Sequence, residues 1–275
     1  MKPRLRPAAP LQRGDAAATV APSSALISDQ KLQEGLSILR EWGLKPLQQH
    51  VAGRTWGYLA GRDQDRRHDL SQRAPLLACA RGGWGAARLL EQPMAWSQGW
   101  LLGFSDVTAL LWARLAAGYD GNVHGPLLTT LAAEPQWSRE RLRCLLFGEP
   151  LPDLSGQPGG GGETSGPLLV ANLTVASHLL GSCWMPDLDG AILIFEDVGE
   201  QPYRIDRMLT HWRLCGQLQK LGGIGFGQFS GCDADESGAE GFSLEEVLME
   251  RTADLQIPRV FGLPVGHVQG NAALP

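Results

Sequence analysis

Residues 100–115 read WLLGFSDVTALLWARL, and this stretch decides the fold. The apolar run at 100–104 is typical of a short buried strand, and residues 107–115 have the composition of a helix. Ser105 therefore stands between a strand and a helix, where the N–H groups of the helix N-terminus can hold a nucleophile and stabilise an oxyanion. In an isolated Ser-Asp pair, the commoner role is a helix cap, with Asp106 favouring the helix dipole. The rest of the chain decides between these two interpretations.

Strand and helix patterns alternate on both sides of this stretch. Strands are predicted at 17–21 and 74–80, and helices at 29–42, 63–72 and 86–91. Gly43 can end the first helix in the left-handed conformation, and the polar helix 63–72 is expected to be a solvated surface. A further helix is predicted at 138–147, with Ser138 as its N-cap. The alternation predicts a parallel sheet covered by helices, a Rossmann- or flavodoxin-like α/β domain.

A glycine-rich stretch then separates a second set of elements. Residues 152–167 hold too many glycines and prolines to form a packed element. Beyond them we expect strands at 168–172, 191–195, 223–229 and 259–262 and helices at 203–221 and 244–254. The predicted organisation is a disordered leader at 1–15, an N-terminal α/β domain at 16–152, a linker at 153–167 and a smaller C-terminal α/β domain at 168–275.

The composition limits the class of protein. Of the 275 residues, 43% are hydrophobic and 19% are charged, which permits a packed core. The net charge of −5 argues against nucleic acid or an anionic membrane surface as the main partner. The sequence holds no apolar run long enough to span a bilayer, and the basic N-terminus lacks the apolar region of a signal peptide. The five widely spaced cysteines include no C-x-x-C, so we expect reduced thiols and no metal site.

Three residues with the chemistry of a hydrolase follow predicted strands. They are Ser105, Glu196 and His267. Ligands of open parallel sheets bind outside the carboxyl ends of the strands, so these side chains could form a nucleophile, an orienting acid and a base. Taken singly, Glu196 could cap a helix and His267 could lie in a surface turn. The glycine turn at 81–85 matches no phosphate loop; it is either a backbone surface for close approach to a substrate or a tight structural turn.

Several short segments are more specific in combination than any one of them is alone. In chain order they are APSS at 21–24, LAGRD at 59–63, RGGWGAARLL at 81–90, GFSDVTAL at 103–110, HGP at 124–126, FEDVGE at 195–200, YRIDRML at 203–209, GQFSG at 227–231 and GLPVGH at 262–267. In this order the segments resemble the LD-carboxypeptidase family of serine peptidases, which includes the microcin C resistance peptidases. The resemblance runs from about Val20 to the C-terminus.

The resemblance implies a catalytic triad of Ser105, Glu196 and His267, with no metal and no cofactor. Backbone N–H groups of Gly83 and Asp106 would hold the oxyanion. The nucleophile would lie on the N-terminal domain and the acid and base on the C-terminal domain, so the active site is expected in the cleft between them. Glu196 is expected to be the acid, and Glu200, four residues later, is expected to be structural or to face the substrate.

The resemblance also implies a substrate and a setting. Family members commonly remove the terminal D-alanine from a murein tetrapeptide during peptidoglycan recycling, in the cytoplasm and often as homodimers. Family chains usually continue past residues 271–275, so we expect a naturally short or a truncated C-terminal domain. Hydrolysis of a peptidyl-nucleotide antibiotic and a non-catalytic peptide-binding role remain alternatives. An α/β-hydrolase is disfavoured because residues 103–107 lack the second glycine of G-x-S-x-G.

Overall fold

The chain divides into two compact units. The computed structural model describes residues 5–26, 28–47, 51–233 and 241–275. The first unit holds the chain up to Pro152 together with Gln269–Pro275, and the second unit holds Asp153–Val268. The chain therefore leaves the first unit once and returns to it for its last seven residues.

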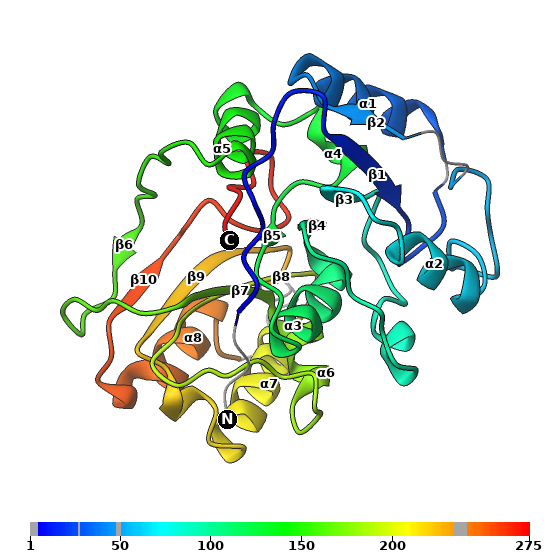
Figure 1. Ribbon diagram of the computed structural model, residues 1–275. Coiled ribbons are helices and arrows are strands. Elements are labelled where there is room, and N and C mark those ends of the chain that lie inside the picture. Colours follow the sequence, from blue (N-terminus) through cyan, green and yellow to red (C-terminus); the bar gives the residue numbers. More distant parts are fainter. Residues whose placement is uncertain (1–4, 27, 48–50, 234–240) are drawn as a thin grey trace. The chain divides into compact units, whose positions relative to one another are not determined.

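The first unit is built on a parallel sheet (Figure 1). Its strands are β1 (Ala16–Val20), β2 (Lys45–Pro46), β3 (Leu76–Cys79), β4 (Trp100–Gly103) and β5 (Asn122–His124). Its helices are α1 (Gln30–Glu41), α2 (Asp63–Leu70), α3 (Thr108–Ala116), α4 (Leu128–Leu131) and α5 (Gln136–Phe147), with 3₁₀ turns at Ala87–Glu91 and Ser105–Val107. In the described residues the strand order is β2-β1-β3-β4-β5, and every pairing is parallel. This is the flavodoxin-like order, which confirms the predicted α/β fold.

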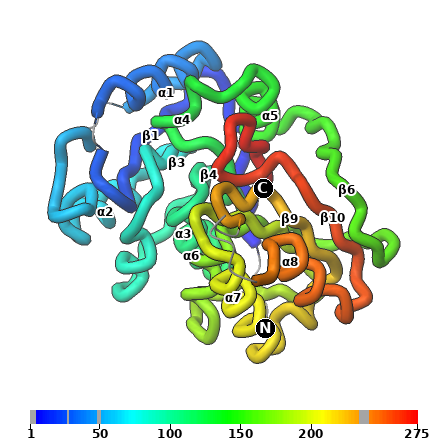
Figure 2. Tube along the Cα trace, turned by 180° about the vertical axis from the view of Figure 1, so that it is seen from behind, coloured from blue at the N-terminus to red at the C-terminus, as the bar shows by residue number. Residues whose placement is uncertain are grey.

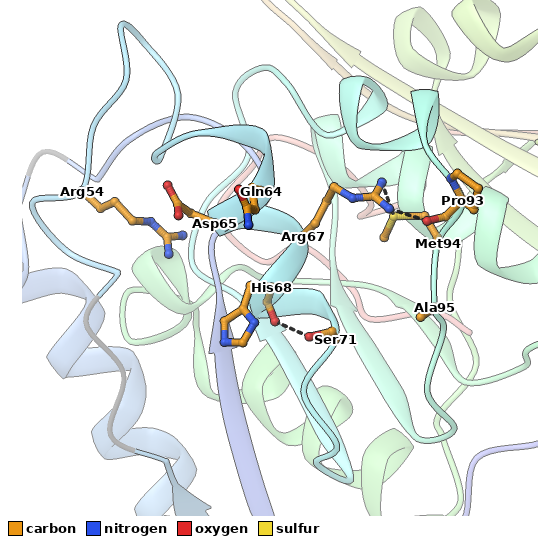
Figure 3. Close-up of a pocket in the computed structure, with 9 residues that line it drawn as sticks. All are labelled: Arg54, Gln64, Asp65, Arg67, His68, Ser71, Pro93, Met94 and Ala95. Atoms are coloured by element: carbon orange, nitrogen blue, oxygen red, sulfur yellow. Dashed lines mark hydrogen bonds between the residues drawn. The ribbon is translucent and has the colours of Figure 1, made fainter.

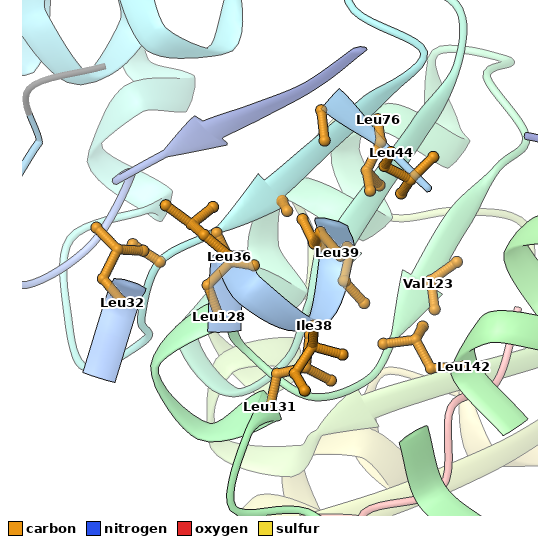
Figure 4. Packing of buried hydrophobic residues seen from close by; sticks show 14 of the residues in the cluster. Leu32, Leu36, Ile38, Leu39, Leu44, Leu76, Val123, Leu128, Leu131 and Leu142 are labelled. Carbon is orange, nitrogen blue, oxygen red and sulfur yellow. The ribbon is translucent and has the colours of Figure 1, made fainter. Parts of the chain in front are cut away.

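The core of the first unit follows from the helical spacing of leucines in α1. Leu32, Leu36 and Leu39 lie on one face of that helix and are buried, as the sequence pattern predicts (Figure 4). This face meets α4, and the two helices approach very closely at Gly35. An added Cβ at Gly35 would lie 2.0 Å from the Leu128 carbonyl oxygen, so only glycine permits this packing.

The expected disordered leader is wrong for residues 5–15. Leu11 is only 3% exposed and joins the core of the first unit. Its N–H donates to the carbonyl oxygen of Leu146 at the end of α5. Because most of the leader is polar, its composition does not indicate that Leu11 is buried. This buried residue and its hydrogen bond keep the segment ordered.

Two expectations about helices in this unit also need correction. Helix α5 begins at Gln136, two residues before the predicted N-cap, and the Ser138 hydroxyl donates to the Asn271 carbonyl oxygen instead. Helix α2 is not a fully solvated surface, because Arg66 and Asp69 are buried. Both charged side chains bind groups inside the unit, which charge patterning alone does not reveal.

The second unit is a mixed sheet with helices. Its strands are β6 (Gln157–Pro158), β7 (Leu168–Asn172), β8 (Ile192–Val198), β9 (Gly223–Ser230) and β10 (Arg259–Phe261). Its helices are α6 (Leu173–Leu179), α7 (Pro202–Leu214) and α8 (Leu244–Thr252), with 3₁₀ turns at Leu218–Lys220 and Ala253–Leu255. The described strands run in the order β6-β10-β9-β8-β7, and only β6 is antiparallel among them. Helices α7 and α8 pack together (Figure 2), and Trp212 of α7 meets Phe195 of β8 with ring centroids 5.1 Å apart.

Part of the expected linker is structured. Strand β6 pairs with β10, and Gly159 lies so close to Phe261 that an added Cβ would be 2.3 Å from its ring. The glycines thus permit close packing here, in addition to making the segment irregular. The helix predicted at 203–221 ends at Leu214, and Gly216 follows with a φ of +66°.

The last residues differ most from the expected domain boundaries. Residues 269–275 were expected in the C-terminal domain, yet they belong to the first unit. Glu134 accepts hydrogen bonds from the N–H groups of Gly270 and Asn271, at 2.7 and 3.2 Å. Arg141 Nε donates to the Ala273 carbonyl oxygen at 2.9 Å, and Leu274 bridges to His124 beside β5.

Among the described helices, none combines the length and the apolar character that crossing a membrane would require.

Candidate active site

The predicted nucleophile and the glycine turn lie at the carboxyl ends of neighbouring strands of the first unit. Ser23 and Ser24 follow β1, the glycine turn 81–86 follows β3, and Ser105 follows β4. The order of the sheet reverses between β1 and β3. In open α/β sheets, ligands bind at such a switch point, outside the carboxyl ends of the strands.

Ser105 has an unusual backbone conformation. Its φ is +63°, and among the described residues other than glycine only Gln256 shares a positive φ. Phe104 before it is extended, and the 3₁₀ turn Ser105–Val107 leads directly into α3. A positive φ outside glycine costs free energy and is concentrated at functional sites. The serine therefore stands at the sharp step from strand to helix that the sequence predicts.

The glycine turn lies directly against Ser105. An added Cβ at Gly82 would be 3.1 Å from Ser105 Cβ and 3.2 Å from its Oγ. Gly83 has a φ of +109°, and a Cβ there would lie 2.4 Å from Ser24 Oγ. That same Ser24 oxygen accepts the Trp84 N–H at 3.0 Å. The turn thus brings bare backbone to the serine, and the predicted donor residues Gly83 and Asp106 belong to the same unit as Ser105.

Glu196 and His267 meet within the second unit. His267 Nδ1 and Glu196 Oε2 are 2.7 Å apart, and the Glu196 side chain is fully buried. Glu196 lies on β8, where the pairing with β9 shifts register between Phe195 and Asp197. Such an irregularity can redirect side chains from the regular alternation of a strand.

The loop that carries His267 is fixed around this pair. Gly266 has a φ of +124°, and an added Cβ would lie 2.9 Å from both Cβ and Oε2 of Glu196. The His267 carbonyl oxygen accepts the Ser230 hydroxyl at 2.9 Å. Glycine at 266 therefore allows the histidine backbone to pass close to the buried acid.

The neighbouring acids have other partners. Asp197 accepts hydrogen bonds from the Thr174 N–H and hydroxyl, both at 2.8 Å, and from the Asn172 amide at 3.1 Å. Burial raises the pKa of Asp197, and the hydrogen bonds from Thr174 and from the Val198 N–H counteract the shift. Glu200 forms an ion pair with Arg204 at 3.3 Å. The structure thus brings Glu196, and neither Asp197 nor Glu200, to the histidine.

Two buried charges beside the glycine turn were missed by sequence reasoning. The Asp106 carboxylate accepts the Ala86 N–H at 2.8 Å, and the Arg66 guanidinium donates to the Gly85 carbonyl oxygen at 2.8 Å. From the sequence, Asp106 is expected either to favour the helix dipole or to donate its N–H to the oxyanion, and its contact with the glycine turn is not predicted. The arginine gives little signal in a helix whose other residues are mostly polar.

Other polar groups of the described chain offer little for a ligand. Ligand atoms of Glu140, Cys144 and Glu149 lie within 4.8 Å of one another, the geometry of a metal site. However, Arg143 forms ion pairs with both carboxylates, at 2.7 and 2.5 Å, so each carboxylate already has a cationic partner.

A cavity of about 540 Å³ opens beside α2 in the first unit (Figure 3). Among its lining residues are Arg54, Arg67 and His68, and no predicted catalytic residue lines it. Arg54 is bound to Asp69, and Arg67 donates to backbone carbonyl oxygens of residues 89–93. These cations are engaged within the protein, so the cavity does not present them to an anion.

Comparison with known proteins identifies the protein family to which the chain belongs. The LD-carboxypeptidase N-terminal domain matches residues 17–125, and the LD-carboxypeptidase C-terminal domain matches residues 165–275. The chain belongs to the LD-carboxypeptidase family. A protein from Synechocystis sp., provisionally named a carboxypeptidase, is 47% identical over 97% of this chain and 90% of its own length. The murein tetrapeptide carboxypeptidase of Pseudomonas aeruginosa is 34% identical over 94% of this chain and 90% of its own.

Solved structures agree with the fold. The muramoyltetrapeptide carboxypeptidase from Oxalobacter formigenes superimposes with a TM-score of 0.79 at 26% identity, covering 94% of this chain and 92% of its own. MccF in complex with glutamyl sulfamoyl guanosine gives a TM-score of 0.84 at 22% identity, over 98% of this chain and 92% of its own. At that identity the second match is evidence of a common fold and of nothing more.

Proposed function

We propose that this protein is a serine carboxypeptidase that releases D-alanine from a murein tetrapeptide, by hydrolysing the amide between an L-centre and the terminal D-residue. The 2.7 Å contact between His267 Nδ1 and the buried Glu196 carboxylate carries the proposal. A carboxylate on Nδ1 fixes the imidazole tautomer, so that Nε2 is the nitrogen that takes a proton. It also stabilises the imidazolium that forms.

The proposed reaction is acyl transfer through Ser105. His267 Nε2 removes the hydroxyl proton as Ser105 Oγ attacks the carbonyl carbon that precedes D-alanine. The tetrahedral intermediate collapses, the C–N bond breaks, and His267 returns the proton to the departing amine. Water, deprotonated by His267, then attacks the acyl-enzyme and restores the Ser105 hydroxyl. The proposal requires His267 Nε2 to reach Ser105 Oγ in the working enzyme.

Backbone N–H groups of Gly83 and Asp106 would stabilise the oxyanion. The bare Gly82 backbone against Ser105 and the positive φ of Gly83 support this assignment, because no side chain lies between the turn and the serine. One such donor typically contributes a factor of about 10² to 10³ in kcat. No metal or cofactor is needed for this chemistry.

A murein peptide is favoured over a peptidyl-nucleotide as substrate. The relative named murein tetrapeptide carboxypeptidase is 34% identical to this chain, whereas the microcin C7 self-immunity protein of Escherichia coli is 24% identical. The cytoplasmic location and the homodimer that the resemblance implies stay predictions.

The first test is D-alanine release from L-Ala-γ-D-Glu-meso-diaminopimelate-D-Ala by wild type and by Ser105→Ala. We expect release by the wild type and a loss of several powers of ten in the variant, with unchanged thermal unfolding. The same peptide ending in L-alanine should be left intact. Turnover by Ser105→Ala close to that of wild type would remove the nucleophile from the proposal.

The alternatives give different results in the same assay. A peptidyl-nucleotide hydrolase would cleave an aminoacyl sulfamoyl nucleotide and leave the tetrapeptide untouched. A binding protein would retain the labelled tetrapeptide in equilibrium dialysis without releasing D-alanine. Either result would overturn the proposed substrate or the proposed activity.

A further inference from the structure

A buried carboxylate that the proposed reaction does not use lies next to the nucleophile. The Asp106 side chain directly follows Ser105, and the residue is only 2% exposed. Its Oδ2 accepts the Ala86 N–H at 2.8 Å, and the Gly85 N–H lies close enough to lower the pKa of the carboxyl. An ionised carboxylate offers only acceptors, so two successive backbone N–H groups suit it well.

The Arg66 guanidinium binds the same turn at a backbone carbonyl group, whereas Asp106 binds it at a backbone N–H group. This fully buried side chain donates to the Gly85 carbonyl oxygen at 2.8 Å and to the Pro22 carbonyl oxygen. Gly85 has a φ of +115°, and an added Cβ would lie 2.3 Å from a Leu59 methyl group. The turn is thus held at the Ala86 N–H by an anion and at the Gly85 carbonyl by a cation.

The turn that Asp106 and Arg66 bind is the same turn that lies against Ser105. Gly82 lies three residues before Gly85, and an added Cβ there would touch Ser105 at 3.1 Å. A shift of the turn would therefore move both Gly82 and the proposed donor Gly83 relative to Ser105. Preorganised donors lose much of their effect when the geometry loosens by a fraction of an ångström.

We infer that Asp106 is a positioning residue whose carboxylate locks the glycine turn against Ser105. The inference rests on the proposed function, in which the Asp106 N–H is itself an oxyanion donor. One residue would then join the two halves of the oxyanion hole: its backbone donates to the oxyanion, and its side chain holds the turn that carries the other donor. Arg66 completes the lock from the carbonyl side.

The electrostatics are consistent with this role. Burial raises the pKa of the Asp106 carboxyl, while the Ser23 side chain, then the Ala86 and Gly85 N–H groups and the Arg66 charge, lower it. A buried carboxylate kept next to backbone donors and a buried cation is stabilised mainly by those contacts. Loss of the carboxylate would leave the Ala86 N–H without its acceptor and would leave Asp63 as the carboxylate paired with Arg66.

The test compares Asp106→Ala and Asp106→Asn with a matched control. Asparagine keeps one carbonyl acceptor and removes the charge, whereas alanine removes every contact of the side chain. Glu134→Gln is the control, because Glu134 is also a buried carboxylate that accepts two backbone N–H groups in the first unit. All variants are assayed as full-length protein, well below the lowest measured unfolding midpoint.

Two readouts separate positioning from general stability. The first is kcat and KM for D-alanine release, with kcat expressed per site titrated by a fluorophosphonate. The second is the rate constant of that labelling, in which Ser105 Oγ bonds to phosphorus and fluoride leaves. We expect kcat to fall about 10²-fold in Asp106→Ala and about tenfold in Asp106→Asn, with KM changing less than about threefold. Labelling should slow in the same order, and Glu134→Gln should stay within about threefold of wild type.

The outcomes distinguish failure of this inference from failure of the proposed function. If wild type neither labels nor releases D-alanine, the proposed function itself fails. If wild type does both and Asp106→Ala retains wild-type kcat and labelling per titrated site, the carboxylate is only structural and the inference fails. An equal loss of kcat in Glu134→Gln would likewise assign the effect to stability and overturn it.

Discussion

Replacing Gly82 with alanine tests whether the glycine turn controls the nucleophile. The φ of Gly82 is not positive, so the backbone accepts alanine without strain. The new methyl group would stand 3.1 Å from Ser105 Cβ and 3.2 Å from Ser105 Oγ. Comfortable contacts between carbon atoms are about 3.5–4.0 Å. The serine or the turn must therefore give way by roughly half an ångström.

This displacement sets the expected size of the effect. A misplacement of about 1 Å in an active site can cost about 10² in rate. Half of that distance corresponds to about tenfold in kcat, or about 1.4 kcal/mol of transition-state stabilisation. The stability of the fold should change little, because alanine also restricts the unfolded chain, by about 0.4–1 kcal/mol. We therefore expect a folded enzyme with a kcat about tenfold lower and an unchanged KM.

The assay is steady-state release of D-alanine together with fluorophosphonate labelling of Ser105. Gly223→Ala, at the start of β9, is the matched control. Its new methyl group would lie 2.9 Å from the Thr164 methyl group. That variant carries a comparable steric contact in the second unit and should keep its kcat. Wild-type kcat and labelling in Gly82→Ala would refute the reasoning that the turn and Ser105 act together.

Two further predictions concern buried carboxyl groups. Glu196→Gln should lower kcat by about 10³ to 10⁴, because glutamine no longer holds the His267 tautomer; a loss below tenfold in saturating substrate would exclude this role. Burial raises the pKa of Glu134 above its usual 4.5, so the folded state binds that proton more tightly than the unfolded state. The unfolding free energy of wild type, relative to Glu134→Gln, should therefore rise as pH falls from the raised pKa towards 4.5 and level off below it. Urea titrations of both proteins across this range measure the difference, and a constant or falling difference would contradict the sign.

Much of the first unit could be predicted from local patterns. The leucine spacing of α1 and the apolar runs of β3 and β4 encode helix and strand directly, because burial of one face or of both faces leaves a readable period. The short strands β2 and β6 were not predicted. Each has only two residues, so their pairing depends on neighbours that are distant in sequence.

The site could be predicted in its residue types but not in its supports. Ser105 follows β4 and His267 follows β10, whereas Glu196 lies within β8 and not after it; the structure brings Glu196 to His267. The joining of Ser105 to that pair stays a prediction. Arg66 and the Asp106 side chain were overlooked, because the burial of a charge depends on partners that only the folded chain brings together.

The return of residues 269–275 to the first unit has a consequence for biosynthesis. A chain emerging from the ribosome presents β1 to β5 and α5 early, yet Ser138, Arg141 and Glu134 bind backbone groups that are translated after the whole second unit. Ala272 and Ala273 are fully buried there, and Leu274 nearly so. The first unit thus stays incomplete until the ribosome has finished the second. A nascent chain is therefore expected to gain protease resistance in its N-terminal half only once residues 269–275 have emerged, so that folding of the first unit depends on synthesis of the second.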